Sequence, residues 1–419
     1  MDKKITVMTI SDHPLLPSGV GTQTKYVIEA LLNSGKFNVI SLGGAIKHQS
    51  YEPKKIEGYP GFWEIFPVDG YGNAQMIGQF IRDRKPDILY FMTDPRFYEW
   101  LWSIDDQIRD KLPMVYYHVW DNYPYPKYNK RYYDANDVIA SISKVTSDIV
   151  QNVCPEVEEE YVPHAVNSDH FYPRPSKEID DLYKINPTLK DKFIFFWNNR
   201  NARRKQSGSL VYWFKEFLER EDVDRSKVCL FMHTDPTDPH GQPLHYLASH
   251  LGFNDGEIFL STNKLQAEQL AALYTMADCT VNISDAEGFG LATLESLSCG
   301  TPIIVNMTGG LQEQVTDGEK WFGIGIEPSS KAVIGSQQVP YIYEDRINKD
   351  DFINALLEMY NKTPQELKEL GDLGQQHVKN NYNFDVFKKQ WVDLMLRVHE
   401  ERGSWDNRKK YNNIRTVEL

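Results

Sequence analysis

Short apolar segments alternate with helical segments through most of this chain, and this alternation limits the possible fold more than any other feature. In the first part of the chain, the segments expected as strands are 5–10, 37–42, 62–67, 87–92, 114–118 and 137–142. The segments expected as helices are 20–34, 72–84, 95–110 and 143–153. Because strands that alternate with helices pair in parallel, the pattern predicts a parallel sheet with helices on both faces.

A second set of apolar segments follows the first. The strands expected in it are 193–198, 228–233, 257–260, 279–283 and 302–306, and the sequence after about residue 349 has a helical pattern. Between the two sets, 170–191 is rich in proline and charge, so we expect a linker there. A chain of 419 residues is too long for one ordinary hydrophobic core. The sequence therefore predicts two α/β domains.

Charge and composition argue against several classes of protein. The formal net charge of −13 disfavours a general affinity for nucleic acid. No apolar run approaches the roughly 18–20 residues of a membrane span, and Ile5–Ile10 is too short for a secretory signal. Cys154, Cys229, Cys279 and Cys299 follow neither a disulfide framework nor a zinc pattern. We therefore expect a cytoplasmic protein with buried, reduced cysteines.

The segment 286–305, AEGFGLATLESLSCGTPIIV, carries the strongest chemical signal. Glu287 precedes a glycine-aromatic-glycine loop, and Glu295 lies eight residues later in a short helical stretch. A carboxylate in such an apolar helix needs a partner, because burying an unpaired charge is costly. Gly288 and Gly290 allow backbone amides to approach a ligand at a helix N-terminus, where the dipole favours an anion. The segment therefore predicts an anion site, most often one for phosphate.

This segment closely resembles the signature of retaining GT-B glycosyltransferases of family 4, with two glutamates eight residues apart, EGFGL and GTP. Ser296 stands where the family usually has alanine. The resemblance implies two Rossmann-like, doubly wound domains that face each other across a cleft. It further implies transfer of a hexose or pentose from a nucleotide-diphosphate sugar to a hydroxyl acceptor, without a metal or other cofactor. The acceptor, whether a glycan, a lipid or a small molecule, is left open.

The resemblance also predicts how the chain divides. We expect residues 1–170 to form the acceptor-side domain, with the C-terminal helix 385–419 packing back on it. Residues 171–384 are expected to bind the nucleotide sugar. The segment 161–173, YVPHAVNSDHFYP, resembles the family's hinge element and supports this boundary.

The resemblance assigns roles within 287–295. Glu295 is expected to bind the ribose hydroxyls of the donor. Glu287, Gly288 and the amides of Phe289, Gly290 and Leu291 are expected to hold the donor sugar and diphosphate, with Glu287 as a catalytic group.

Basic residues follow the first expected strand of the second set, in the segment 198–208, NNRNARRKQSG. Fixed cations there could neutralise a departing diphosphate. Arg200 and Lys205 match the family's paired cations, although Asn199 replaces a glycine. We therefore expect Arg200 and Lys205 to act in donor binding and catalysis. A solvated basic turn is the alternative.

A glycine-containing loop also follows the first strand of the chain. Gly19 and Gly21 lead directly into a helix, so their backbone could approach a phosphate or a sugar. The match to a dinucleotide fingerprint fails, because the third glycine is missing. The position resembles the family's glycine-rich first loop, with Ser18-Gly19 in place of Gly-Gly, so Gly19 and Gly21 are expected to contact the donor.

His118 ends an expected strand, and the string HVWD resembles the family's histidine-aspartate loop. The resemblance favours a contact of His118 with the donor sugar, where a neutral imidazole can hydrogen-bond a hydroxyl. The aromatic segment after it contains Trp120, Tyr123 and Tyr125 and is too polar and proline-rich for a strand. We expect these three residues to contribute to an acceptor site.

Three other functions stay open at this stage. A non-catalytic sugar-nucleotide or glycan-binding module could share the fold, and so could an NAD-dependent oxidoreductase. The same transferase chemistry could act on a hydroxymethylated DNA base, as in certain phage enzymes, although the acidic composition disfavours it. Peripheral association with a membrane is also left open. The histidines of the 233–250 region are not spaced as ligands of one metal, so we expect no metal site.

Overall fold

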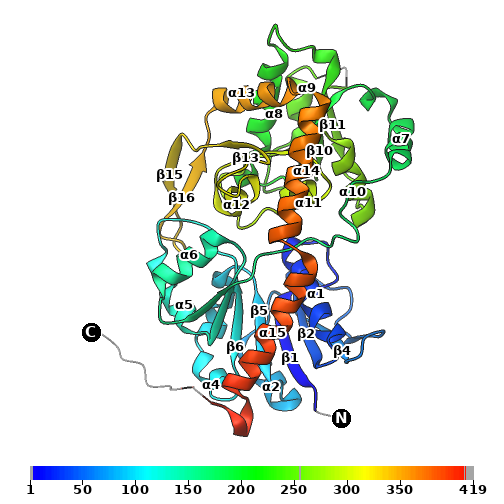
Figure 1. The fold of residues 1–419 in the computed structure, drawn as a ribbon. Helices are drawn as coiled ribbons and strands as arrows, with labels where there is room; N and C mark the ends of the chain where they lie inside the picture. The colour runs from blue at the N-terminus through cyan, green and yellow to red at the C-terminus, as the bar shows by residue number, and fades with distance from the viewer. Residues whose placement is uncertain (1–2, 254–255, 410, 412–419) are drawn as a thin grey trace. The chain divides into compact units, whose positions relative to one another are not determined.

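The computed structural model describes residues 3–253, 256–409 and 411 (Figure 1). The chain divides into two compact units. Unit 1 comprises Met1–His164, Gly335–Tyr341 and Asp385–Leu419, and unit 2 comprises Ala165–Ile334 and Ile342–Phe384. The two parallel-sheet α/β domains predicted from the sequence are confirmed, because each unit is built on its own largely parallel sheet.

Within the described residues, unit 1 has an eight-stranded sheet in the order β3-β4-β2-β1-β5-β6-β7-β8. All neighbouring strands are parallel except β3 and β4. The strands are β1 Ile5–Asp12, β2 Phe37–Gly44, β3 Lys54–Ile56, β4 Trp63–Pro67, β5 Ile88–Met92, β6 Met114–His118, β7 Val138–Ser141 and β8 Glu158–Tyr161. The helices are α1 Gly19–Asn33, α2 Ala74–Arg84, α3 Glu99–Trp102, α4 Asp105–Arg109, α5 Lys130–Asp134 and α6 Lys144–Val153.

The last helix, α15 Phe384–Arg402, packs its residues from Asp385 onward within unit 1 (Figure 1). Its Trp391 is fully buried and makes edge-to-face ring contacts with Tyr90 of β5 and Tyr117 of β6, at 5.4 and 4.7 Å between centroids. Arg397 forms ion pairs with Glu158 and Glu160 of β8. An apolar anchor and an ionic contact to a sheet edge therefore fix α15 in this unit.

Unit 2 has a six-stranded parallel sheet among the described residues, in the order β11-β10-β9-β12-β13-β14. The strands are β9 Phe193–Asn198, β10 Val228–His233, β11 Ile258–Ser261, β12 Cys279–Asn282, β13 Ile303–Asn306 and β14 Gly323–Ile326. The helices are α7 Ser176–Ile185, α8 Ser207–Leu218, α9 Leu244–His250, α10 Ala267–Met276, α11 Leu291–Ser298, α12 Gln312–Val315, α13 Lys349–Tyr360 and α14 Pro364–Asn381. An antiparallel hairpin, β15 Ser330–Ile334 and β16 Ile342–Arg346, completes the unit.

The strand order of each sheet creates one point at which the winding direction reverses. In unit 1 this point lies between β1 and β5, and in unit 2 it lies between β9 and β12. Loops that leave the carboxyl ends of the two strands at such a point diverge to opposite faces of the sheet and leave a crevice for ligands. The loops after β9 and β12 are therefore where a site is expected in unit 2.

Two helical expectations were wrong in detail. The single helix predicted over 95–110 is divided into the 3-10 helix Pro95–Tyr98, α3 and α4, because Ile104 leaves the helical conformation with φ −124°. The linker predicted over 170–191 contains α7. None of the α7 residues is fully buried, but Ile179, Leu182 and Tyr183 follow a helical spacing and are half-buried, so that spacing was a signal for the helix.

Candidate functional site

The carboxyl ends of β9 and β12 bring together two of the residues predicted from separate motifs. Lys205 lies in the 3-10 helix Arg203–Lys205 after β9, and Glu287 lies in the loop after β12. The Lys205 Nζ donates to Oε2 of Glu287 in an ion pair whose side chains are only 9% and 12% exposed. The pairing follows from the parallel contact of β9 with β12, which places both loops at the same sheet edge.

Burial opposes the ionisation of Glu287, but the positive charges of Lys205 and Arg204 outweigh it. The pKa of Glu287 therefore lies below the ordinary value for glutamate, and this residue is a carboxylate at neutral pH. The Arg204 guanidinium donates to the carbonyl of Ala286, next to Glu287, and the Asp285 N–H donates to the carbonyl of Arg204 at 2.8 Å. The two loops thus hold each other by backbone as well as by charge.

Glycines determine the path of the loop that carries Glu287. Gly290 has φ +95° and Gly309 has φ +49°, both in the left-handed region that favours glycine. A Cβ on Gly309 would lie 1.9 Å from the carbonyl oxygen of Glu287, and a Cβ on Gly310 would lie 2.6 Å from the Cα of Phe289. The neighbouring backbone segments are therefore in closer contact than any side chain would allow.

The helices that follow β9 and β12 begin without a side-chain cap. Gly290 precedes α11 and Gln206 precedes α8, and neither makes a side-chain capping bond to its helix. In unit 1, by contrast, Ser18 and Ser143 cap α1 and α6 with their hydroxyls. Uncapped first-turn N–H groups and the positive dipole end suit an anion.

The other donor residues predicted in this segment occupy distinct environments. Gly288 is half-buried, Phe289 is buried with its ring edge-to-face against Tyr382 at 5.6 Å, and Leu291 is the first residue of α11. The amide of Gln314 donates to the carbonyls of Phe289 and Gly290 at 2.7 and 3.1 Å. These contacts fix the turn into α11.

Glu295 is held by a chain of hydrogen bonds. The hydroxyl of Tyr274, in α10, donates to Oε2 of Glu295 at 2.8 Å, and the amide of Asn198 donates to that hydroxyl at 2.8 Å. Burial raises the pKa of Glu295 to about 7, against the opposing effect of the Tyr274 bond. Because its pKa lies near neutrality, Glu295 exists in both protonation states around pH 7.

Arg200, the second predicted cation, has other partners. Its guanidinium donates to both carboxylate oxygens of Asp238, at 2.6 and 3.3 Å, and lies 2.8 Å from Nδ1 of His240. The Arg200 side chain is 61% exposed. The structure therefore brings Lys205 to Glu287 and gives Arg200 an exposed ion pair after β10.

The unit 1 residues predicted for the donor lie at the start of α1. Gly19 begins the helix, and the N–H of Gly21 donates to the hydroxyl of Ser18 at 2.9 Å. That hydroxyl donates in turn to Asp12 at 2.6 Å, and Asp12 also accepts from the hydroxyl of Tyr71 at 2.8 Å. Ser18, where the family usually has glycine, is therefore the cap of α1.

His118 ends β6 and is fully buried. Its Nε2 lies 2.8 Å from the hydroxyl of Tyr133, whose ring it meets edge-to-face at 4.9 Å. Burial lowers the pKa of His118 to about 3, so the imidazole is neutral. The structure thus gives His118 a protein partner at Nε2, and its predicted contact with the donor sugar stays a prediction.

The predicted acceptor aromatics differ in exposure. Trp120 is 6% exposed and meets Tyr128 edge-to-face at 5.9 Å. The hydroxyls of Tyr123 and Tyr125 both donate to Asp148 of α6, at 2.6 and 3.0 Å, and their rings are 5.4 Å apart. Tyr125 is the more accessible of this pair, with 37% of its surface exposed.

Sequence patterns missed several residues that shape the site. Tyr274 and Gln314 were missed because a single polar residue in a helix gives no local signal of its distant partner. Glu344 of β16 was missed for the same reason, although it is buried and forms ion pairs with Arg203 and Arg346. A buried glutamate between two arginines fixes the hairpin against the loop after β9.

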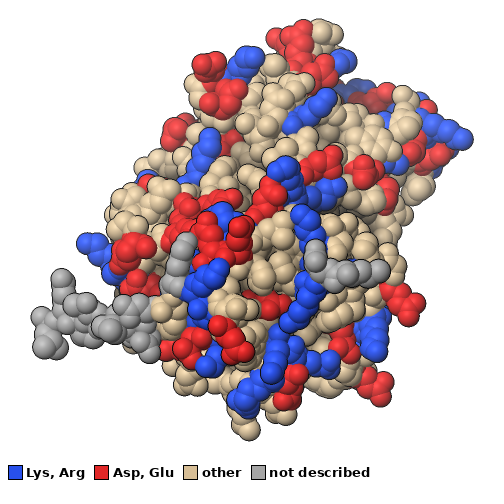
Figure 2. All heavy atoms as spheres, turned by 60° about the horizontal axis from the view of Figure 1, so that its bottom comes forward, with Lys and Arg blue, Asp and Glu red and all other residues tan. Residues whose placement is uncertain are grey.

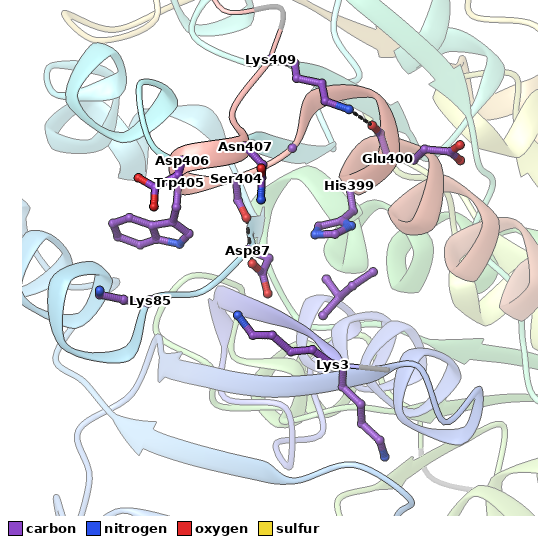
Figure 3. A pocket seen from close by; sticks show the side chains of 13 residues that line it. Lys3, Lys85, Asp87, His399, Glu400, Ser404, Trp405, Asp406, Asn407 and Lys409 are labelled. Atoms are coloured by element: carbon purple, nitrogen blue, oxygen red, sulfur yellow. Dashed lines mark hydrogen bonds between the residues drawn. The ribbon is translucent and has the colours of Figure 1, made fainter. Parts of the chain in front are cut away.

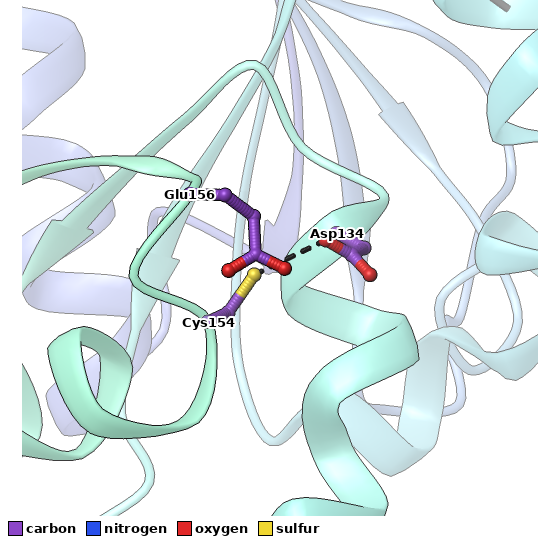
Figure 4. Close-up of side chains that lie close together, drawn as sticks. All are labelled: Asp134, Cys154 and Glu156. Carbon is purple, nitrogen blue, oxygen red and sulfur yellow. Dashed lines mark hydrogen bonds between the residues drawn. The ribbon is translucent and has the colours of Figure 1, made fainter. Parts of the chain in front are cut away.

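Among the described residues, one group of side chains gathers potential metal-binding atoms: Asp134, Cys154 and Glu156 of unit 1 (Figure 4). Burial and a hydrogen bond to Asp134 raise the pKa of Cys154 to about 12, so its sulfur is a thiol. Lys130 forms ion pairs with both Asp134 and Glu156. The ammonium of Lys130 thus already supplies the positive charge that these acids attract.

Comparisons with known sequences match parts of the chain. Residues 180–357 match the profile of the family Glycosyl transferases group 1. The chain is 28% identical over 191 residues to a GDP-mannose-dependent alpha-(1-6)-phosphatidylinositol monomannoside mannosyltransferase of Mycolicibacterium smegmatis, covering 44% of this chain and 47% of that protein. It is 40% identical over 109 residues to a D-inositol 3-phosphate glycosyltransferase of Acidothermus cellulolyticus, covering 25% and 23%. The matched regions span half or less of these relatives.

Solved structures match over nearly the whole chain. A sucrose-phosphate synthase from Thermosynechococcus elongatus has a TM-score of 0.74 at 18% identity, covering 95% of this chain and 100% of that one. An alpha,alpha-trehalose 6-phosphate synthase from Burkholderia multivorans has a TM-score of 0.68 at 12% identity, covering 95% and 99%. In the part of the chain that the structure describes, no helix is both long and apolar enough to cross a membrane. Residues 180–357 are thus similar to the glycosyl transferases group 1 family, and the fold is that of GT-B proteins.

Proposed function

We propose that this protein is a retaining glycosyltransferase that moves a hexose or pentose from a nucleotide-diphosphate sugar to a hydroxyl acceptor. The observation that carries the proposal is the buried ion pair of Lys205 with Glu287, at the edge where α8 and α11 begin without side-chain caps. A diphosphate suits this edge, because uncapped helix N-termini and fixed cations favour the same charge.

Each group at this edge has a distinct part in the proposed reaction. Lys205 neutralises the diphosphate as the glycosidic bond breaks, and Glu287 binds the sugar ring close to it. Glu295 accepts hydrogen bonds from the ribose hydroxyls when it is ionised. Retention results from attack on the same face that the diphosphate leaves, with a phosphate oxygen of the leaving group taking the proton of the acceptor hydroxyl.

The first acceptors to test carry a phosphate or an inositol ring. The relatives compared above are named for action on inositol 3-phosphate or on a phosphatidylinositol mannoside. Because the matched regions span half or less of those proteins, the acceptor class is part of the proposal. A donor screen by thermal shift precedes the acceptor screen, since a tightly bound donor stabilises the folded state in proportion to its saturation.

The deciding experiment compares two isosteric substitutions in the full chain. We expect Glu287→Gln to lower kcat/KM for transfer by about 100-fold or more, because it removes the negative charge near the reacting carbon. The exposed Glu369 of α14 provides the control, and Glu369→Gln should leave transfer unchanged. Turnover by Glu287→Gln within a few-fold of wild type would contradict the proposed role, provided that both variants melt as cooperatively as wild type.

A further inference from the structure

A cavity of about 630 Å³ lies in unit 1, away from every residue discussed above as a donor or acceptor contact (Figure 3). Its walls come from three parts of the chain: the start of β1, the segment before β5, and the turn after α15. Because β1 and β5 are parallel neighbours, the beginnings of these strands meet at one edge of the sheet. Ligands of α/β sheets bind at the opposite edge, beyond the carboxyl ends. The cavity is therefore separate from the predicted contacts of Gly19, Gly21 and His118.

Lysines dominate the lining of this cavity. Lys3, Lys4, Lys85 and Lys409 border it, together with the imidazole of His399. The Lys4 ammonium donates to the carbonyl of Pro60. The concentration of lysine is local, because the chain as a whole has a net charge of −13 and the face shown in Figure 2 exposes both acidic and basic side chains.

The acids around the cavity offer little competition for these lysines. Asp87 is buried, and its two carboxylate oxygens accept bonds from the backbone N–H of Thr6 at 2.9 Å and the hydroxyl of Ser404 at 2.7 Å. The carboxylates of Glu400 and Asp406 are exposed, and Figure 3 shows both turned away from Asp87 and His399. The cavity interior therefore faces more positive than negative charge.

The end of α15 also reaches this cavity, and a helix C-terminus by itself disfavours an anion. Its last carbonyls are already engaged. The carbonyl of His399 accepts from the N–H of Gly403 at 2.9 Å, and that of Arg402 accepts from the Arg408 guanidinium at 3.1 Å. The Lys409 ammonium lies 3.4 Å from the carbonyl of Glu400. These donors reduce the negative field at the helix end and place one lysine beside it.

The backbone at the rim is held in an uncommon conformation at two positions. Lys85 has φ +44° and Trp405 has φ +53°, both in the left-handed region. The Lys85 ammonium lies over the indole of Trp405 at 5.8 Å, and the indole N–H donates to the carbonyl of Pro86 at 2.9 Å. Strained residues persist where the surrounding structure fixes them, and they concentrate at ligand sites. The rim thus presents a rigid aromatic surface next to a cation.

We propose that this cavity binds a phosphate-bearing small molecule, with the phosphate attracted by the lysines around the cavity and the remainder lying against Trp405. The volume suits a compact organic phosphate, because small-molecule pockets commonly measure about 300–1,000 Å³. The site goes beyond the proposed function and does not depend on it. A soluble organic phosphate and a phosphorylated lipid headgroup share this chemistry.

The test measures hydrogen exchange of the full-length protein with and without inorganic pyrophosphate. We expect protection of peptides covering 3–8 and 399–409 in wild type, and its loss in the double variant Lys85→Gln/Lys409→Gln. The matched control is Lys47→Gln/Lys54→Gln, which removes the same charge from exposed lysines of unit 1 outside this cavity and should keep the protection. Pyrophosphate is also expected to bind at the proposed donor edge of unit 2. Protection of peptides covering 284–291 reports that binding separately from binding in the cavity.

A second arm distinguishes the two sources of phosphate. The second arm is a flotation assay with phosphatidylcholine vesicles that either contain or lack phosphatidylinositol 4-phosphate. A lipid headgroup is identified if wild type floats only with the vesicles that contain phosphatidylinositol 4-phosphate and the double variant floats with neither. Pyrophosphate protection without flotation identifies a soluble phosphate. The proposal is overturned if millimolar pyrophosphate leaves 399–409 unprotected and neither vesicle binds. It is equally overturned if the double variant and the control behave alike.

Discussion

Replacing Lys205 with methionine removes one charge of a buried ion pair while keeping most of the side-chain length. Glu287 would then be a carboxylate 12% exposed with its hydrogen-bonded cation gone, although Arg204 would still contribute positive charge. Removing one partner of a buried pair costs about 3–5 kcal/mol, because the other charge is left uncompensated. The residual exposure and Arg204 place this case near the lower end, at about 3 kcal/mol.

The exposed pair of Arg200 with Asp238 provides a matched comparison in the same unit. The Arg200 side chain is 61% exposed, so Arg200→Met should cost only about 0–1 kcal/mol. For a domain of about 150–250 residues, each kcal/mol lowers the melting temperature by roughly 2–4 °C. We therefore expect the unit 2 transition of Lys205→Met to fall by about 6–12 °C and that of Arg200→Met by less than about 4 °C.

The pH dependence has a defined sign. In wild type the pKa of Glu287 is depressed, so its ion pair stabilises the fold above the ordinary pKa of glutamate and is lost as the pH falls through the lower folded value. Without Lys205, one of the charges that oppose the effect of burial is gone, so the pKa of Glu287 rises from its wild-type value and protonation relieves the unpaired charge. The difference in stability between wild type and Lys205→Met should therefore be largest near neutral pH and shrink as the solution is acidified.

Differential scanning calorimetry of wild type, both single variants and Lys205→Met/Glu287→Gln measures these effects. The double variant should recover most of the loss, because neither buried charge then remains. The reasoning is refuted if Lys205→Met destabilises unit 2 no more than Arg200→Met does. It also fails if the double variant is no more stable than Lys205→Met alone.

Two further predictions concern the backbone and the hydrogen bonds of the same edge. Gly309→Ala should cost at least about 2 kcal/mol of stability and reduce transfer, because the new Cβ would lie 1.9 Å from the carbonyl oxygen of Glu287. The control is Gly318→Ala, which has φ +96° but no atom within 4 Å of the new Cβ, so it should show only the cost of backbone strain. Equal melting temperatures for the two variants would contradict this prediction. The hydrogen bond from Tyr274 lowers the pKa of Glu295, so Tyr274→Phe should raise that pKa further. If the donor binds only when Glu295 is ionised, the KM of Tyr274→Phe for the donor should rise about three- to tenfold at pH 7, with kcat nearly constant. The KM should recover at higher pH, and a KM that does not depend on pH would contradict the need for ionised Glu295.

Strands whose residues are mostly apolar and β-branched or aromatic could be predicted from the sequence. Strands made of polar residues could not. β5 and β9 are buried along most of their length, and their sequences are nearly continuous apolar runs. β8 is Glu-Glu-Glu-Tyr and half-buried at the edge of its sheet. Its glutamates are paired with Arg397 and Arg402, more than 200 residues away in the chain, and a local pattern carries no trace of such partners.

The residue types of the site were predictable, but their pairing was not. Arg200 and Lys205 lie five residues apart in one basic segment, and no local pattern assigns them different partners. In the structure Lys205 is buried against Glu287, while Arg200 is exposed and bound to Asp238. The difference arises because the 3-10 helix after β9 turns Lys205 inward, and Gln206 with φ +57° then leads into α8. That local geometry depends on the packing of β9 against β12.

Strand order also explains why two motifs 82 residues apart form one site. β10 and β11 follow β9 on one side of it, and the chain returns to the other side as β12. The loops after β9 and β12 are thus neighbours whatever the length of chain between them. Changes in the length of the loops between β10 and β12 should therefore leave Lys205 paired with Glu287. A substitution that disturbs the pairing of Thr280 in β12 with Phe196 in β9 should instead affect both motifs together.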